Sequence, residues 1–302
     1  MSNKFVSWAI FVILCIIWGS SFKLMKDSTA LPASQIAALR IFSAGLVFVP
    51  FAFFHTRKIP RHKLGIVILS AVFGNLLPAF LFAAAITRLD ASLAGILNSL
   101  TPICVAVVGI FFFNQKISSP KFTGVLTGFF GLVLLTVYPA LTGERNISFD
   151  NFGYTLLILL ATFLYGINVN IVGQYLKGVN PVHAATVSLA FMTVPTAAVL
   201  WQQGFLQLDH GSEPIRQAIV SSVVLGVAGS AIATALFYIL VKRAGGLFAS
   251  LVTYGIPFIA LFWGFLDGEQ ITWIEIICLG IILLGVYLAN RPDRRVAEAT
   301  EN

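Results

Sequence analysis

Ten apolar stretches, each long enough to cross a lipid bilayer, follow one another along this chain. A transmembrane α-helix needs about 20 predominantly apolar residues to span the hydrocarbon core. Only short polar loops separate the stretches, so no hydrophilic region remains to fold as a separate soluble domain. The sequence therefore predicts an all-α integral membrane protein. The stretches cover 5–26, 32–54, 64–87, 91–113, 120–138, 152–175, 181–206, 216–241, 247–267 and 272–290.

The composition agrees with a chain that lies mostly inside a bilayer. Of the 302 residues, 58% are hydrophobic and 10% are charged, whereas a soluble domain carries about a quarter charged residues. Such a chain cannot cover a water-facing surface. Cys15, Cys104 and Cys278 lie in apolar stretches without the spacing of a metal site. We expect them to be buried thiols, and we expect neither a metal nor a cofactor.

The net charge of +7 reflects membrane topology rather than nucleic-acid binding. With ten spans, alternate loops share one side of the membrane. Thirteen Lys and Arg residues fall on the side of the two termini, against five on the other side. Because Lys and Arg concentrate in cytoplasmic loops, we expect a multi-pass protein of the plasma membrane, of the bacterial inner-membrane type. Both termini, including the tail 293–302, would then be cytoplasmic.

The two halves of the sequence resemble each other in register. Trp18 and Gly19 precede Tyr165 and Gly166 by 147 residues, and five further pairs are separated by 155 residues. We therefore expect two repeats of five helices, 1–142 and 150–292. The five pairs are Gly74 with Gly229, Phe82 with Phe237, Arg88 with Arg243, Pro102 with Pro257, and Gln115 with Gln270.

An odd number of helices per repeat makes the second copy enter the membrane from the opposite side. Inverted repeats allow two mirror-related conformations, each open to one side, with the substrate near the midplane. An enzyme has no particular need of this symmetry, whereas a transporter that works by alternating access does. The expected fold is thus ten transmembrane helices arranged as two inverted five-helix repeats.

Several motifs occur in a recognisable order: "WGSSF", "ALR", "LDASLAGILNSLTPICVAVVG", "LFASLVTYGIPFIALFWGFLDGEQIT" and "GIILLGVYLA". Through these motifs nearly the whole chain resembles the EamA family of the drug/metabolite transporter superfamily. The resemblance implies two five-helix repeats and export or exchange of small metabolites, often amino acids, with substrates that differ widely between members. The family usually has a glutamate at the end of its fourth and ninth helices, and this chain has Asn114 and Glu269 there.

Arg40 interrupts the apolar stretch 32–54. A cation in the hydrocarbon core is unfavourable by about 2.5–3.5 kcal/mol on insertion scales unless something solvates it. Arg40 follows Pro32 by eight residues, which places it about 12 Å below the outer end of a helix. It must therefore face the bundle. It is either a structural or gating residue, or a fixed cation for a substrate carboxylate.

Neutral polar and aromatic side chains lie at mid-membrane depth in both halves, and two pairs among them obey the repeat spacing. They suit either a shared central cavity or hydrogen bonds between helices, which contribute about 0.6 kcal/mol each. We favour a cavity for the set as a whole. The candidate substrate-binding residues are Trp18, Ser21, Arg40, Asn75, Asn98, Thr101, Tyr165, Asn168, Ser230, Thr253, Tyr254 and Trp263.

A neutral, hydrogen-bonding and aromatic lining suits a small zwitterion such as an amino acid better than a nucleotide or a sugar phosphate. Pro102 and Pro257 are each expected to break a helix in equivalent positions and free backbone carbonyl groups that could face the cavity. The alternative is that they are hinges or packing kinks. No Asp or Glu lies securely in the middle of a span. This argues against a strongly proton-driven mechanism, because buried carboxylates are the usual proton carriers in pumps.

Other functional classes fit this sequence less well. It contains no HExxH, GxSxG or other nucleophile–base set, so we do not expect an enzyme. A lipid-carrier flippase would need a cleft open to lipid, and a multidrug-type exporter of cations would need a buried acid. The expected partners are a small-molecule substrate and the bilayer.

Two GxxxG patterns, Gly124 with Gly128 and Gly264 with Gly268, permit close helix contact. We assign both patterns to packing within the chain. The alternative is a homodimer, for which the stretches 120–138 and 272–290 are the expected site because they are the least polar.

Overall fold

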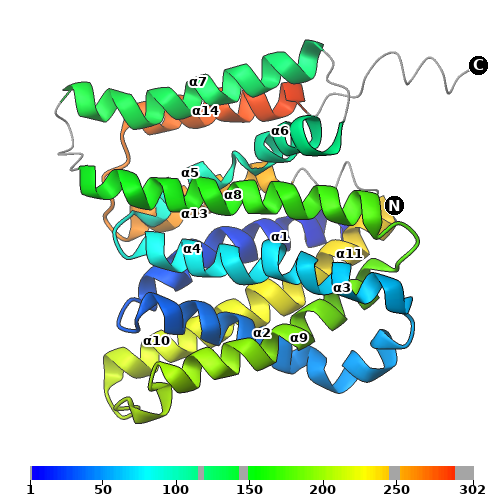
Figure 1. The fold of residues 1–302 in the computed structure, drawn as a ribbon. Helices are drawn as coiled ribbons and strands as arrows, with labels where there is room; N and C mark the ends of the chain where they lie inside the picture. The colour runs from blue at the N-terminus through cyan, green and yellow to red at the C-terminus, as the bar shows by residue number, and fades with distance from the viewer. Residues whose placement is uncertain (1, 115–118, 143–148, 245–251, 290–302) are drawn as a thin grey trace, which may run out of the picture.

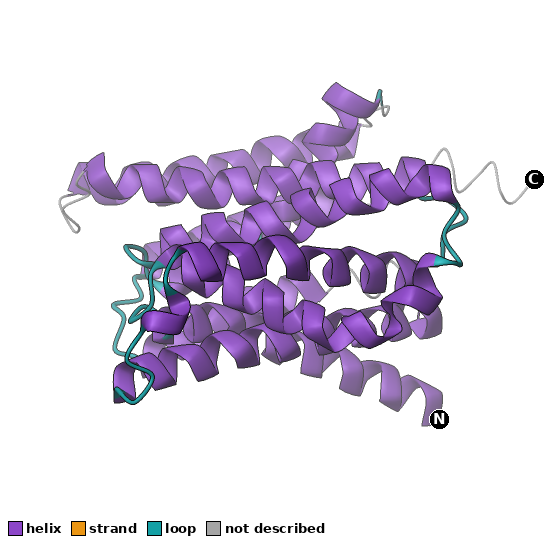
Figure 2. Ribbon diagram, turned by 60° about the horizontal axis from the view of Figure 1, so that its bottom comes forward, coloured by secondary structure: helices purple, strands orange, loops and turns teal. Residues whose placement is uncertain are grey.

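A computed structural model describes residues 2–114, 119–142, 149–244 and 252–289 of the chain. Every regular element in these ranges is a helix (Figure 2), and no strand occurs among them. The tail 293–302 lies outside the described residues. In chain order the elements are α1 (Ser2–Asp27), α2 (Ala33–Thr56), α3 (Arg61–Ala71), η1 (Val72–Leu76), α4 (Leu77–Ile86), α5 (Ala91–Asn98), α6 (Thr101–Phe113), α7 (Ser119–Thr142), α8 (Phe149–Tyr175), α9 (Pro181–Gln202), η2 (Phe205–Gln207), α10 (Glu213–Val224), η3 (Leu225–Ile232), α11 (Ala233–Ala244), α13 (Val252–Leu266) and α14 (Trp273–Ala289).

Seven helical segments of the described chain are long and apolar enough to cross a membrane, and three shorter apolar helices accompany them. The prediction of an all-helical membrane protein is confirmed. The seven segments are Phe5–Asp27, Ala33–Thr56, Arg61–Ile86, Ala91–Phe113, Phe152–Tyr175, Pro181–Gln202 and Glu213–Phe237, and the three shorter helices are Phe122–Leu135, Val252–Leu266 and Trp273–Leu288.

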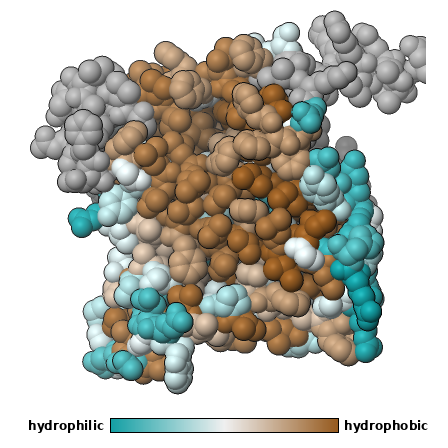
Figure 3. Space-filling view, viewed as in Figure 1, coloured by the Kyte–Doolittle hydropathy of each residue, from teal (hydrophilic) through white to brown (hydrophobic). Residues whose placement is uncertain are grey.

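An apolar band covers the face of the molecule shown in Figure 3, and hydrophilic residues gather at its two ends. Large apolar side chains such as Phe111, Phe129 and Trp273 project outward, with exposures of 77%, 59% and 81%. Water would disfavour this surface, whereas lipid tails solvate it. The band therefore marks the part of the surface that contacts the bilayer.

Local sequence signals set several helix ends. The Asn180 side chain accepts a hydrogen bond from the Val182 N–H, and Pro181 begins α9, where its missing N–H needs no partner. At the start of α14, the Thr272 N–H donates to Glu275 at 2.8 Å, and the Glu275 N–H donates to the Thr272 hydroxyl at 3.3 Å. This reciprocal pair is a capping box.

The helices pack in pairs that cross between the two halves of the sequence. α2 packs on α9, α7 on α14, α1 on α13, and both α4 and α6 on α8. Figure 1 shows α7 and α14 side by side at one edge of the bundle, with α8 between them and the helices α2, α9 and α10. Each half of the chain is therefore stabilised mainly by contacts with the other half.

The two GxxxG patterns have different roles. A Cβ at Gly285 of α14 would collide with the backbone at Gly124 and Gly128 of α7, so this pattern permits close packing, as expected. Gly264 similarly lies against Ser92 of α5. The second glycine of that pattern, Gly268, has φ +77° and follows the end of α13. Packing was thus the wrong reading for Gly268, because it terminates the helix.

The two proline residues expected to break helices also differ. Residues 99 and 100 separate α5 from α6, and Pro102 lies in the first turn of α6, where a missing N–H is tolerated. Pro257 instead lies inside α13, which continues through it. The expected break was wrong for Pro257, since a proline within a packed transmembrane helix does not interrupt the helix there.

Two π-helical segments interrupt the helices that contain Gly74 and Gly229. η1 joins α3 to α4, and η3 joins α10 to α11. A π-turn carries one extra residue and shifts the faces of the helix on either side of it, and such turns occur frequently at functional sites. Each segment contains one glycine of the repeat-related pair, Gly74 in η1 and Gly229 in η3.

Candidate functional site

Arg40 lies on α2 and points toward η3. Its Nε–H donates a hydrogen bond to the Ser230 hydroxyl at 3.3 Å. The close approach of the two elements depends on Gly226, where a Cβ would collide with the Arg40 carbonyl and the Ser43 hydroxyl. The arginine therefore faces the helix bundle rather than lipid.

The other end of the Arg40 guanidinium has no protein acceptor among the described residues. An arginine carries five N–H donors, and only the Nε–H donates to the protein. The terminal nitrogen atoms remain accessible, although the group lies deep among the helices. No described carboxylate lies within ion-pair distance of it. Four N–H groups are thus available to a ligand or to water.

Tyr165 of α8 lies close enough to Arg40 for the two groups to interact electrostatically. Its phenol makes no hydrogen bond to the described part of the protein, and the side chain is half-buried. The ring stacks on Phe82 of α4 at 6.2 Å between centroids, and Phe82 contacts Phe22 of α1 at 6.0 Å. This aromatic row holds the Tyr165 ring while its hydroxyl stays available.

Asn168 lies one turn beyond Tyr165 on α8. Its side-chain oxygen accepts a hydrogen bond from the Ser70 hydroxyl at 2.6 Å, and its amide contacts Gly74 of η1. The neighbouring Asn75 is half-buried and makes no side-chain hydrogen bond to the described chain. The Asn75 amide and the Asn168 amino group are therefore also available to a ligand.

Other candidates have polar groups that already bond to the protein. The Trp18 N–H donates to the Gly229 carbonyl at 2.9 Å, and its ring contacts Phe237 at 5.5 Å. The Ser21 hydroxyl donates to the Ile17 carbonyl at 3.0 Å. The Trp18 contacts position α1 against η3 and α11, so Trp18 offers a ligand its ring surface rather than its N–H.

The last six candidates are Ser230, described above, and five residues of the segments 91–113 and 252–266. Trp263 donates to the Ser20 hydroxyl at 2.8 Å, and Thr101 donates to the Asn98 carbonyl at 2.7 Å. Thr253 and Tyr254 lie in the first turn of α13 and are half-buried. The main partners of α5 are α13 and α8, and those of α6 include α8, whereas neither α5 nor α6 is a main partner of α2, which carries Arg40.

Two features of the site were absent from the sequence-based prediction. Ser70, which orients Asn168, sits one helical turn before Gly74 and gave no signal other than its polarity in an apolar stretch. The π-turns were also missed. The repeat-related pair Gly74 and Gly229 was the sequence signal available for the π-turns. Each glycine allows a helix of the other half to approach closely.

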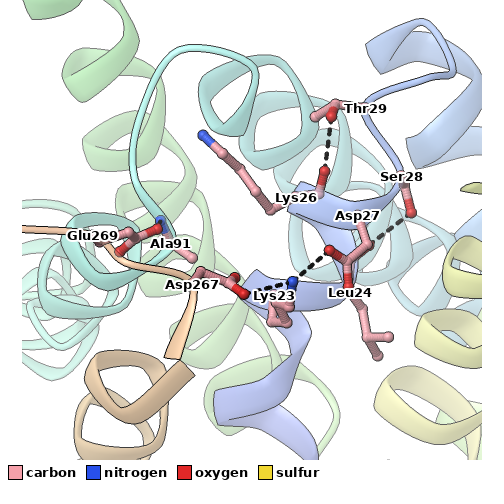
Figure 4. A network of polar contacts seen from close by, with 9 residues as sticks. All are labelled: Lys23, Leu24, Lys26, Asp27, Ser28, Thr29, Ala91, Asp267 and Glu269. Carbon is pink, nitrogen blue, oxygen red and sulfur yellow. Dashed lines mark hydrogen bonds and ion pairs between the residues drawn. The ribbon is translucent and has the colours of Figure 1, made fainter. Parts of the chain in front are cut away.

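A charged network joins helix ends on the side that the distribution of Lys and Arg predicts to be outside (Figure 4). Lys23 at the end of α1 forms ion pairs with Asp27 at 2.7 Å and with Asp267 beyond α13 at 2.9 Å. Glu269 accepts hydrogen bonds from the backbone N–H groups of Ala91 at 2.8 Å and Ser92 at 3.1 Å. Its carboxylate thus caps α5 from another segment, where the helix dipole favours negative charge. The network ties α1, α5 and α13 together at this end.

A family model described as the EamA-like transporter family matches residues 6–137 and again residues 152–291. The chain belongs to this family. It is therefore a membrane-embedded, multi-pass member of a transporter family, and the resemblance found in the sequence is confirmed. The family is named as a transporter family, and the relative YedA of Escherichia coli is named as an inner membrane transporter.

Two relatives and one solved structure illustrate the similarity. A WAT1-related chloroplastic protein of Arabidopsis thaliana is 24% identical over 300 residues, which are 96% of this chain and 71% of that protein. The uncharacterized inner membrane transporter YedA of Escherichia coli K12 is 24% identical over 295 residues, which are 92% of this chain and 88% of that protein. A crystal structure with 16% sequence identity covers 98% of this chain with a TM-score of 0.61, and it shares the fold.

Proposed function

We propose that this protein is a secondary transporter that exports or exchanges a small metabolite by alternating access. Its two repeats, 1–142 and 150–292, form five transmembrane helices each and insert in opposite orientations. Both termini lie in the cytoplasm, since the Lys and Arg residues concentrate on their side. The double match of the family model supports this division of the chain.

Repeat-related contacts support the inverted repeat. Gly19 of α1 contacts Ile259 of α13, and Gly166 of α8 contacts the backbone of Cys104 on α6. Gly166 follows Gly19 by 147 residues, and Cys104 precedes Ile259 by 155 residues. The second contact is therefore the repeat-related equivalent of the first. A pseudo-two-fold axis that exchanges the halves explains why both contacts occur.

A second pair of contacts obeys the same relation. A Cβ on Gly229 would meet the Ser21 hydroxyl, and a Cβ on Gly74 would meet the Asn168 amide. Both glycines lie in π-helical segments. The pairing of α1 with α11 likewise corresponds to that of α8 with α4. Two halves that pack by the same rules can exchange conformations at little difference in free energy, which alternating access requires.

The observation that carries the proposal is a set of half-buried polar groups on α2, η1 and α8 that the described protein leaves available. Arg40, Asn75, Tyr165 and Asn168 present donors or acceptors that the described protein leaves unused, with the Trp18 ring nearby. Unused polar groups inside a membrane are costly and are typical of a substrate pathway. An arginine among neutral groups suits a carboxylate-bearing metabolite, and amino acids or related zwitterions are the first class to test.

Export from proteoliposomes tests this proposal. Vesicles would be loaded with a mixture of isotopically labelled amino acids, organic acids, polyamines, nucleosides, sugar phosphates and cationic drugs. We expect saturable, protein-dependent efflux of at least one carboxylate-bearing compound, and loss of that efflux in Arg40→Ala.

The same preparation separates the alternatives. Scrambling of labelled lipid without metabolite efflux would favour a lipid-carrier flippase, and efflux of cationic drugs alone would favour multidrug export. Either result would overturn the proposal. Size-exclusion chromatography on purified protein would show whether the chain forms a homodimer.

A further inference from the structure

The site around Arg40 contains one positive charge and no described negative one. Pro32 and Pro181 relate the two halves at a separation of 149 residues, so the position equivalent to Arg40 is Leu189, which is 2% exposed. The repeat therefore supplies no second cation. The described acidic residues all lie in loops or in the first or last turn of a helix, and they are Asp27, Asp90, Asp150, Asp209, Glu213, Asp267, Glu269 and Glu275.

A single cation in this setting favours one charge class of ligand. An uncompensated charge within the membrane is unfavourable by several kcal/mol, and a ligand of opposite charge removes this penalty. A zwitterion brings its own ammonium group, which would lie near the guanidinium without a carboxylate partner. The attraction between the guanidinium and a carboxylate and the repulsion between the guanidinium and an ammonium group both increase in a site shielded from bulk water.

The donors around Arg40 also match a carboxylate in geometry. The terminal N–H groups of an arginine form a planar fork that binds the two oxygens of a carboxylate. The Tyr165 hydroxyl can supply a further donor, since it makes no hydrogen bond to the described chain. The half-buried rings of Trp18, Tyr165 and Phe237 offer apolar surface close by.

We infer that this site takes a monoanionic carboxylate with an apolar body, and that the ligand needs no ammonium group. This inference rests on the proposed transport function and specifies its substrate class. Arg40 binds the carboxylate, Tyr165 donates to one of its oxygens, and the apolar body contacts the aromatic rings.

Four compounds with nearly the same phenylalkyl skeleton test the charge class directly. They are 3-phenylpropionate (anion), phenylalanine (zwitterion), 2-phenylethylamine (cation) and 3-phenylpropan-1-ol (neutral). Binding would be measured by thermal shift and equilibrium dialysis on purified protein at neutral pH. We expect 3-phenylpropionate to bind about tenfold or more tightly than each of the other three.

Variants assign the effect to Arg40. Arg40→Gln should weaken 3-phenylpropionate binding by about tenfold, whereas Arg40→Lys keeps the charge but loses the planar fork and should lie in between. Arg88→Gln is the matched control, because it removes one arginine at an exposed helix end and should bind like the wild type. A monodisperse size-exclusion peak and an unchanged helical circular dichroism spectrum would show that each variant folds.

Tighter binding of phenylalanine, the amine or the alcohol would overturn the inference, and so would equal binding of 3-phenylpropionate by folded Arg40→Gln. The flux assay keeps this failure distinct from a failure of the proposed function. Saturable efflux of a zwitterion or another metabolite would leave the transporter in place with a different substrate class. Absence of efflux for every compound would reject the transport proposal itself.

Discussion

Trp18 and Tyr165 occupy matching positions in the two halves of the chain, yet their polar groups have different surroundings. The Trp18 N–H bonds to the Gly229 carbonyl, whereas the Tyr165 hydroxyl has no partner in the described chain. A polar aromatic residue within a transmembrane helix can therefore serve packing or ligand binding. The distinction depends on whether a neighbouring helix offers an acceptor at the right place.

Trp18→Phe tests the packing role at this scale. The phenyl ring can still contact Phe237, but the hydrogen bond to Gly229 is lost and its carbonyl is left without this donor. We expect the free energy of unfolding to fall by about 1 kcal/mol, measured by thermal and denaturant unfolding in detergent. Trp8→Phe, at an exposed position of α1, is the control and should change stability little.

Whole helices approach closely at glycines that the repeat relates. Gly19 and Gly166 each contact a helix of the other half, and neither has space for a Cβ. These contacts hold α1 to α13 and α8 to α6. The elements are thus positioned by a few points of close backbone approach rather than by a continuous polar interface.

Gly19→Ala and Gly166→Ala should both destabilise the protein, by about 1–3 kcal/mol each, because the added methyl group forces the helices apart. Thermal unfolding in detergent would measure the change. Gly173→Ala and Gly280→Ala are matched helical controls with no atom within 4 Å of the new Cβ. They should be neutral or slightly stabilising. Equal effects at all four positions would argue against the observed helix contacts.

Glu269 connects elements differently, by capping α5 from the segment after α13. Glu269→Gln keeps the size of the side chain but removes the charge, so we expect a loss of about 1 kcal/mol in unfolding free energy. Glu213→Gln is the control, since Glu213 pairs with Arg216 on the exposed surface. Such a pair contributes about 0–1 kcal/mol. A smaller loss for Glu269→Gln than for the control would contradict this capping role.

For the whole molecule, the apolar band marks the membrane-spanning part, and the uneven distribution of Lys and Arg predicts the orientation in the membrane. Polar residues gather at the two ends of the helices, while the lipid-facing surface between them carries large apolar side chains. The side rich in Lys and Arg is expected to be cytoplasmic.

Single-cysteine labelling tests this orientation in a background where Cys15, Cys104 and Cys278 are changed to Ala. Thr29→Cys and Lys58→Cys place one exposed thiol at each end of the bundle. A membrane-impermeant maleimide should label Thr29→Cys in intact cells. It should label Lys58→Cys only after permeabilisation. The reverse pattern would invert the proposed topology.

Much of the fold was predictable because the bilayer imposes simple requirements. Apolar length identifies the spans, and the repeat spacing indicates which residues are equivalent. The position of Arg40 inside the bundle followed from the cost of exposing a cation to lipid. The π-turns were not predictable, because a change from i→i+4 to i→i+5 bonding has no distinct composition. The continuity of α13 through Pro257 was missed for a related reason, since packing by neighbouring helices compensates the lost hydrogen bond.

The sequence by itself determined that this chain is a helical membrane protein of the EamA-like family, because apolar runs and repeat-related motifs are properties of residue order. Only the tertiary structure decided which polar groups remain available to a ligand. The Trp18, Ser21 and Trp263 donors are used by the protein, whereas most of the Arg40 guanidinium and the Tyr165 hydroxyl are not. The physical reason is that hydrogen bonding in a helix bundle depends on neighbours far apart in the chain, and three-dimensional packing alone brings these neighbours together.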